Sequence, residues 1–332
     1  MASTAAHKDP TFRNYDLGSA KNYAKNREGY PDKVIDIIIN QHTSTGGKLD
    51  LLVDIGCGPG TATRSVAPHF QHAIGADPGQ SMIETARSIP SSTASGEPVT
   101  YEICSANALS NLSALKQYPE GVDLITAATA AHWFEYPDFY REAAKILKPG
   151  GSIIIWCTKG YYVDERTTPN AKKLQALWQD FENDALVPYE LEGNKMTKEL
   201  LASLPLPWSS YEGQDVDSET KELLKSFDEK DYRRLVFNDE GQVKPGEDFL
   251  LARRVTLAQS KLMLGTVSPV TRWREANKEK LEKGKIEDIV DKVMRRTREL
   301  LDETEEGKGR DWMEGGSALV IMVIKKKCSG LM

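Results

Sequence analysis

The 332-residue sequence predicts an α/β fold in which helices cover both faces of a parallel sheet. Short apolar runs alternate with segments of helical periodicity through the first half of the chain. A glycine-rich turn follows the first run, and Lys148-Pro149-Gly150-Gly151 ends a helix before the fifth. After Thr158 this alternation stops, which predicts a mainly helical lid inserted into the fold.

Five strands with helices between them are expected before Thr158. The predicted strands are 51–55, 73–76, 99–104, 122–128 and 152–157. The predicted helices are 33–41, 61–70, 79–88, 112–118 and 138–147. The first strand is a short apolar run with glycines behind it, which is typical of a buried parallel strand.

The C-terminal half is expected to cover and complete this core. An apolar stripe at helical spacing predicts a helix over 286–301, and 318–324 should be the last strand. Short strands are also expected near 232–238 and 248–255. The expected domains are a polar, mobile N-terminus at 1–18, a core with an N-terminal cap segment at 19–158, a lid insertion at 159–265, and a C-terminal helix and strand at 266–332.

Composition excludes several classes of protein. The formal net charge of −6 argues against a surface that neutralises nucleic-acid phosphates. No apolar run reaches the roughly 18 residues that span a bilayer, and Met1 to Pro10 lacks the apolar region of a secretory signal. The four cysteines are scattered without a Cys-x-x-Cys pair, which favours reduced thiols in the cytoplasm over disulfides or a zinc site. We therefore expect a cytoplasmic protein without a nucleic-acid, membrane or metal partner, and we expect Lys325 to Lys327 to form a solvated edge.

The strongest local pattern is the glycine loop from Asp54 to Thr61, between the first strand and the next helix. Its glycines allow a tight turn and a close approach to a ligand. The spacing is G-x-G-x-G rather than the G-x-G-x-x-G of dinucleotide sites, and Asp54 would repel a pyrophosphate but attract an ammonium group. Asp77 ends the second strand, where an acid can bind ribose hydroxyls. The pattern favours S-adenosylmethionine over NAD, with an ordinary turn that binds no ligand as the alternative.

Four segments resemble one family at the positions where its motifs occur. Residues 54–61 and 77–82 resemble the first two motifs of class I S-adenosylmethionine-dependent methyltransferases. Ala131-His132-Trp133-Phe134 after the fourth strand and residues 147–151 before the fifth are similar to the small-molecule branch that includes the trans-aconitate methyltransferases and related fungal enzymes. The resemblance covers about residues 19–158, and it implies a Rossmann-like, seven-stranded, mostly parallel sheet.

Two further segments are similar to that branch over shorter stretches. Residues 23–31 are similar to its N-terminal Tyr-x-x-x-Arg-Pro-x-Tyr-Pro segment, except that Glu28 stands where proline is usual. Ser268 to Trp273 is loosely similar to its Thr-x-Ser-x-x-x-Arg-Trp stretch. The resemblance therefore implies that both ends of the chain contribute to the site.

The resemblance also implies which residues bind the cofactor. Asp54 and Gly56 should meet the methionine part, Asp77 both ribose hydroxyls, and Met82 the adenine. The complete expected set is Tyr23, Arg27, Asp54, Gly56, Asp77, Met82, Ala106, Asn107 and Ala127. Plain packing remains the alternative for Met82, and a surface ion pair remains the alternative for Arg27.

His132 is the catalytic candidate, because it lies just past a strand end, where open α/β sheets place ligands. A neutral imidazole could take a proton from a hydroxyl, and a protonated one could bind a carboxylate. The alternative is that His132 only anchors its loop. The residues expected to bind the methyl acceptor are His132, Trp133, Arg272 and Trp273. Other cations that could meet an anionic acceptor are Arg233, Arg234 and Arg274.

The expected activity is methyl transfer to a small organic molecule, with S-adenosylhomocysteine as the product. A carboxylic acid that becomes a methyl ester is the leading acceptor, and a phenol, amine or activated carbon of a fungal secondary metabolite is the alternative. Ala127-Ala128-Thr129-Ala130 stands where an Asn/Asp-Pro-Pro-Tyr motif would indicate base methylation. A regulatory protein that keeps the methyltransferase fold is a further alternative, and the oligomeric state is left open.

Overall fold

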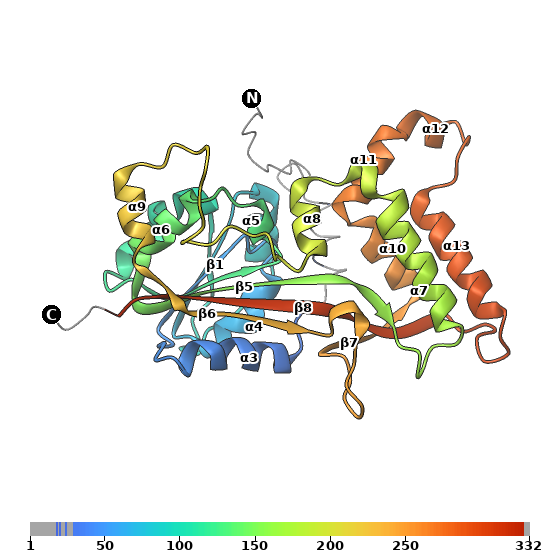
Figure 1. The fold of residues 1–332 in the computed structure, drawn as a ribbon, viewed down its shortest axis with the longest axis horizontal. Coiled ribbons are helices and arrows are strands. Elements are labelled where there is room, and N and C mark those ends of the chain that lie inside the picture. The colour runs from blue at the N-terminus through green and yellow to red at the C-terminus, as the bar shows by residue number, and fades with distance from the viewer. Residues whose placement is uncertain (1–17, 19, 21–23, 25–28, 329–332) are drawn as a thin grey trace. The chain divides into compact units, whose positions relative to one another are not determined.

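The computed structural model describes residues 18, 20, 24 and 29–328. It divides into two compact units (Figure 1). The first comprises the chain through Cys157, Glu199–Val236 and the chain from Val320 onward, and the second comprises Thr158–Lys198 and Phe237–Leu319. The segment at 159–265, expected to form a single lid insertion, is thus shared between the two units.

The strands form one sheet in the order β3-β2-β1-β4-β5-β8-β6, with β7 paired to β8. Their bounds are β1 Leu51–Ile55, β2 His72–Asp77, β3 Thr100–Ile103, β4 Val122–Ala128, β5 Leu147–Val163, β6 Phe227–Phe237, β7 Leu251–Thr256 and β8 Trp312–Lys326. The first five strands pair in parallel, whereas β7 and β8 are antiparallel. The mostly parallel α/β fold is confirmed.

Eight strands are present in the described chain instead of the expected seven. β8 begins at Trp312, six positions before the expected start at Ala318. Its first residues pair with β7, from Leu251 opposite Ser317 to Thr256 opposite Trp312. Each strand satisfies the main-chain groups of the other, so β8 extends beyond its apolar run and β7 becomes the eighth strand.

The bounds of the helices are α3 Asp32–Thr43, α4 Thr61–Val66, α5 Gln80–Ser88, α6 Asp138–Ile146, α7 Ala171–Asp180, α8 Glu192–Lys198, α9 Ser218–Leu224, α10 Leu257–Gly265, α11 Ser268–Ala276, α12 Lys278–Glu282 and α13 Ile289–Asp302. Helices α3 to α6 and α13 lie at or near ranges that the sequence predicts to be helical. Within the first unit, α3 and α6 lie on opposite sides of the sheet (Figure 1). Across the described ranges, no helix has the length and apolar character needed to cross a bilayer.

Two predicted helices are shorter or tighter than expected. The helix expected over 61–70 ends at Val66, and Pro68 then lies in a short 3-10 helix, Ala67–His69, because proline cannot continue the hydrogen-bonding of an α-helix. The segment expected to be helical at 112–118 is the 3-10 helix Ser113–Gln117. Both changes leave the strand order unaffected.

The expectation of a solvated lysine edge at the chain's end is wrong for two of the three lysines. Lys325 is only 3% exposed, and its Nζ donates to the Gly150 carbonyl at 2.6 Å. Lys326 Nζ donates to the carbonyls of Ala144 and Leu147 at 2.5 and 2.7 Å. These carbonyls lie at the end of α6 and the start of β5, and the last carbonyls of a helix have no partner within the helix. The lysines at the end of β8 supply the missing donors.

Lys325 belongs to a buried chain of hydrogen bonds that joins α3, β5 and β8. Its Nζ also donates to Ser152 Oγ at 2.9 Å, and Ser152 Oγ lies 2.9 Å from Nδ1 of His42. His42 Nε2 donates to the Lys48 carbonyl at 2.7 Å, so Nδ1 accepts from Ser152 in the neutral ring. Burial lowers the pKa of His42, which favours this neutral form. The buried ammonium of Lys325 thereby has two acceptors, the Gly150 carbonyl and the Ser152 hydroxyl.

Removal of the Ser152 hydroxyl should expose the importance of this chain. Ser152→Ala leaves His42 Nδ1 without a donor and takes one acceptor from Lys325, so unfolding free energy should fall by about 2–3 kcal/mol. Ser88→Ala is the matched control, because Ser88 is exposed and its hydroxyl bonds only the nearby Thr85 carbonyl. Urea denaturation of both variants measures the effect. Equal losses in the two variants would contradict a special role for the buried chain.

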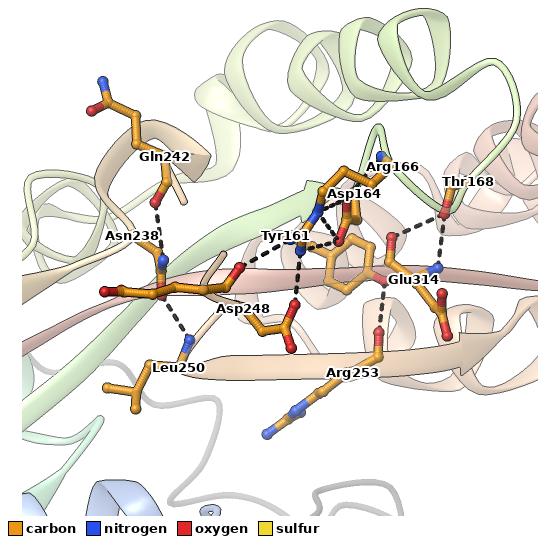
Figure 2. A network of polar contacts seen from close by, with 11 residues as sticks. Tyr161, Asp164, Arg166, Thr168, Asn238, Gln242, Asp248, Leu250, Arg253 and Glu314 are labelled. Carbon is orange, nitrogen blue, oxygen red and sulfur yellow. Dashed lines mark hydrogen bonds and ion pairs between the residues drawn. The ribbon is translucent and has the colours of Figure 1, made fainter. Parts of the chain in front are cut away.

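The second unit has its own apolar core and a polar network between the segment after β5 and the segment before β7. Trp178, from α7, lies in that core and donates its Nε1–H to Thr297 Oγ1 on α13 at 3.1 Å. Figure 2 shows Arg166 between two carboxylates, Asp164 at 2.7 Å and Asp248 at 3.0 Å. These contacts fix the segment that follows β5 to the segment that precedes β7.

Candidate active site

Polar side chains gather on one face of the parallel sheet near its carboxyl edge. Asp54 of β1 is the register partner of Gly75 on β2 and of Thr126 on β4. Register partners point to the same face, and residues two apart along a strand do so as well. Asp77, two residues beyond Gly75, therefore shares the face of Asp54, and so does Trp156 on β5.

Asp54 is fully buried beneath the glycine loop. Thr63 of α4 donates its hydroxyl to Oδ2 at 2.5 Å, and Thr126 of β4 donates to Oδ1 at 2.8 Å. Burial raises the pKa of Asp54 to about 6 against the opposing effect of these two hydroxyls, and the nearby charge of Asp77 raises it further. The carboxyl thus titrates just below neutral pH and is ionised at pH 7.

The glycine loop requires glycine at both of its ends. Gly56 has φ of +67°, and a Cβ there would lie 2.5 Å from the Cβ of Ala130. Gly60 has φ of +79°, and a Cβ there would lie 2.5 Å from the hydroxyl of Tyr101. Side chains rarely adopt this left-handed conformation. The loop therefore combines a tight turn with close packing against β3 and the turn after β4.

Asp77 is fixed by main-chain donors from two loops. Its Oδ2 accepts the Gly58 N–H at 3.0 Å, and its Oδ1 accepts the Gly79 N–H at 2.7 Å. These bonds orient the carboxylate at the end of β2 and tie it to the glycine loop. A carboxylate accepts hydrogen bonds only, at about four lone-pair positions, so this group suits the hydroxyls of a ribose.

The residues expected to surround the adenine lie after β2 and β3. Met82 on α5 and Ala106, at the start of a 3-10 helix (Ala106–Asn111), are buried, at 3% and 7% exposure. Asn107 Nδ2 donates to Glu135 at 2.5 Å, and Asn107 Oδ1 accepts from Ser105 at 2.6 Å. The side-chain amide is thus held in one orientation, and adenine contact by these residues stays a prediction.

The other predicted site residues are distributed over different parts of the structure. Ala127 is fully buried and, by strand alternation, its side chain lies on the face opposite Asp54, so only its main chain shares this edge. His132 and Trp133 lie in the 3-10 helix Ala131–Trp133 after β4, with ring centroids 4.7 Å apart. Tyr23 and Arg27 lie outside the described residues.

Arg272 and Trp273 lie on α11 in the second unit. Arg272 donates from Nε to the Tyr189 carbonyl and from a terminal nitrogen to Asn194 Oδ1, both at 2.6 Å. These bonds give Arg272 a structural role within that unit, and its part in acceptor binding stays a prediction. Arg274 forms a bidentate pair with Asp288 at 2.7 and 3.0 Å.

Three residues near this edge were given no role from the sequence. Thr61 Oγ1 and Ser81 Oγ are buried hydroxyls without a hydrogen-bond partner in the described part of the chain. They lie at the starts of α4 and α5, inside residues 54–61 and 77–82. These two motifs could therefore have indicated both hydroxyls as site groups. Thr129, after β4, has φ of +51°, which is unusual for a branched side chain and has no sequence signature.

These features fit S-adenosylmethionine. A Cβ at Gly58 would meet no atom within 4 Å, so a ligand can approach the loop there. One charged carboxylate can face an ammonium group, and the other can accept ribose hydroxyls. The buried hydroxyls of Thr61 and Ser81 are further polar groups beside the loops. No set of three or more His, Cys, Asp and Glu side chains in the described ranges could hold a metal ion.

Comparisons with known proteins show what this chain is similar to. Residues 52–151 match the model of the methyltransferase domain family. A protein of Dictyostelium discoideum named as a methyltransferase is 38% identical over 44% of this chain, which spans about half (51%) of that relative. A protein of Saccharomyces cerevisiae named as an S-adenosylmethionine-dependent methyltransferase is 24% identical over 81% of this chain and 85% of its own length.

A solved structure shows the same fold. It is described as a type II methyltransferase from Anaeromyxobacter dehalogenans, with a TM-score of 0.56 and 18% identity over 91% of this chain and 97% of that one. The matched domain contains Asp54, the glycine loop and Asp77. Residues 52–151 therefore form a methyltransferase domain, and the chain is similar to S-adenosylmethionine-dependent methyltransferases in sequence and to a solved methyltransferase in fold.

Proposed function

We propose that this protein transfers the methyl group of S-adenosylmethionine to a small organic molecule, with a carboxylic acid as the leading acceptor. The observation that carries the proposal is the arrangement of Asp54 and Asp77 on one face of the sheet, on either side of the glycine loop. When bound, S-adenosylmethionine supplies a methyl group already activated by a sulfonium.

The chain's own residues bind S-adenosylmethionine and orient it. Asp77 is held by two main-chain N–H groups and accepts ribose hydroxyls, while the buried charge of Asp54 attracts the ammonium group. Met82, buried on α5, would pack against the adenine. Because the methyl group is already activated, positioning alone can supply on the order of 7–11 kcal/mol of the barrier.

The choice of a carboxylic acid as acceptor is supported by the hydrogen bonds that already occupy the carboxylates at this edge. Asp54 is bound by two hydroxyls, Asp77 by two N–H groups, and Glu135 by the Asn107 amide. None is placed as a general base, which leaves His132 in the turn after β4. A carboxylic acid is ionised at pH 7 and needs no base. Phenols, amines and activated carbons of secondary metabolites are the alternative acceptors.

The proposed location is the cytoplasm, and the proposed partner is a small molecule rather than nucleic acid or membrane. Cys57, Cys104 and Cys328 are unbridged thiols, as is usual in a reducing compartment. The formal net charge of −6 supports the same choice of partner.

Asp54→Asn should have opposite effects on stability and on cofactor binding. The folded pKa of about 6 lies above the unfolded value of 3.8, so this carboxyl stabilises the fold below pH 4 and that contribution is lost as the pH rises through 6. At pH 7.5 the amide should raise the unfolding free energy by up to about 3 kcal/mol. Calorimetry should show at least tenfold weaker binding of S-adenosylmethionine, because the charge that attracts the ammonium group is gone.

Asp77→Asn is the matched control. It should also weaken binding, but without added stability, because an amide loses one of the two main-chain donors. Normal cofactor affinity in both variants would refute the site.

Cofactor affinity should depend on pH through Asp54. Because its pKa is about 6, affinity should fall as the pH drops from 7 to 5, by up to tenfold per unit once the carboxyl is protonated. Asp54→Asn should show a flat profile over this range. Titration calorimetry with the demethylated product measures both profiles, and an equal slope in the two proteins would assign the effect to another group.

The acceptor class is tested by incubating the protein with radiolabelled-methyl cofactor and a panel of carboxylic acids, phenols and amines. Label on acids supports the proposal, and label on phenols or amines alone contradicts it. Cofactor binding without label on any acceptor would favour a regulatory protein of this fold.

His132→Gln separates the acceptor classes by mechanism. With an ionised acid, kcat should change less than about tenfold, because no proton is removed. With a phenol or ammonium acceptor that needs His132 as base, kcat should fall by about 10²–10⁴. Steady-state kinetics on the labelled acceptor distinguishes the two results.

A further inference from the structure

A buried tryptophan on β5 has an unused hydrogen-bond donor. Trp156 is fully buried, and its Nε1–H has no hydrogen-bond partner in the residues that the structure describes. An indole nitrogen can only donate, and buried donors are nearly always satisfied. Trp178 shows the usual case, with its Nε1–H on Thr297 at 3.1 Å. The unused donor of Trp156 therefore needs an explanation.

The position of Trp156 in the sheet suggests a ligand. Its register partner is Ala128, the last residue of β4, and it shares the sheet face of Asp54 and Asp77. The strand order is β2-β1-β4-β5, so the two carboxylates lie on one side of β4 and Trp156 lies on the other. A cofactor held by the carboxylates reaches β4, and an acceptor beside it would lie next to Trp156.

A strained turn supplies a second donor beside this tryptophan. Thr129 follows β4, and its N–H donates to the Trp156 carbonyl at 2.7 Å. Its backbone is left-handed, with φ of +51°, and strained conformations of this kind are found most often at binding and catalytic sites. The Thr129 side chain is exposed. The turn thus holds a hydroxyl at the end of β4, directly before the segment that carries His132.

Tyr30 contacts both Trp156 and Thr129. Its ring meets Trp156 edge-on with centroids 5.5 Å apart, and its hydroxyl lies 3.3 Å from Thr129 Oγ1. That distance is long for a bond between hydroxyls. The contact is weak, so a stronger acceptor can replace it.

We propose that the Trp156 indole N–H and the Thr129 hydroxyl bind an oxygen atom of the methyl acceptor, the carboxylate oxygen that is not methylated. This inference rests on the proposed function. Both groups donate to a carboxylate, which is acceptor-only. An ammonium or protonated amine carries donors alone and cannot pair with the indole. The subsite therefore selects oxygen acids over amines.

The first test compares Trp156→Phe with Trp178→Phe, using the carboxylic acid labelled most rapidly in the acceptor panel. Trp156→Phe should lower kcat/KM for that acid about 10- to 100-fold, leave the affinity for S-adenosylmethionine unchanged, and lower Tm less than Trp178→Phe does, because both variants lose the same side-chain volume but only Trp178→Phe loses a satisfied hydrogen bond. Trp178→Phe removes a satisfied buried donor, so it should lower Tm and leave kcat/KM unchanged.

The second test follows the donor itself. The indole N–H signal missing from the spectrum of Trp156→Phe identifies Trp156 by nuclear magnetic resonance. Addition of the acid, with the demethylated cofactor present, should move this signal downfield. Thr129→Val keeps the branched shape without the hydroxyl and should raise KM for the acid, whereas Thr129→Ser should restore it.

The outcomes separate this inference from the proposed function. Absence of cofactor binding, or of any labelled acceptor, overturns the proposed function. If an acid is labelled but Trp156→Phe lowers Tm as much as Trp178→Phe does and leaves kcat/KM unchanged, the donor serves the fold, for instance through a buried water, and the inference is overturned. Label on amines alone also overturns it.

Discussion

The burial of one carboxylate beneath the glycine loop is the constraint on which the rest of the structure depends. A charge withdrawn from water is costly unless hydrogen bonds compensate it. Asp54 obtains these hydrogen bonds from Thr63 on α4 and Thr126 on β4. They require the observed register between β1 and β4 and fix the position of α4 beside β1. Burial still raises the pKa of Asp54 to about 6. The fold thus keeps a destabilising charge at the position where a cationic ligand group would be attracted.

The two edges of the sheet use their polar groups differently. At the carboxyl edge, Asp77 is oriented by the loops it joins, and the donor of Trp156 is left unused. At the amino edge, Lys325 is enclosed by the Gly150 carbonyl and Ser152, and the chain continues to His42. Hydrogen-bonded buried networks stabilise a fold, whereas a buried polar group without a partner needs a separate explanation. This difference separates the stabilising edge from the proposed site.

Much of the core and of the cofactor site could be predicted from local sequence. β1 and β4 have the predicted bounds, because a short apolar run before a glycine or a small-residue turn leaves little choice of strand end. The glycine loop and Asp77 were found for a similar reason, since left-handed glycines and a strand-end acid are local features. The start of β8 was missed, because its extra length depends on pairing with β7, more than 50 residues earlier in the sequence.

The sequence alone determined the parallel core and the glycine loop with its two acids, because each depends on residues close together in the chain. Tertiary structure alone decided three other properties. Lys325 has the sequence context of a surface lysine, but the Gly150 carbonyl and the Ser152 hydroxyl on β5 accept hydrogen bonds from its ammonium and make its burial favourable. Thr129 takes a left-handed turn that only its contacts impose. Trp156 has an unsatisfied donor because no described neighbour offers an acceptor, and sequence patterns carry no information about hydrogen bonds that are not made.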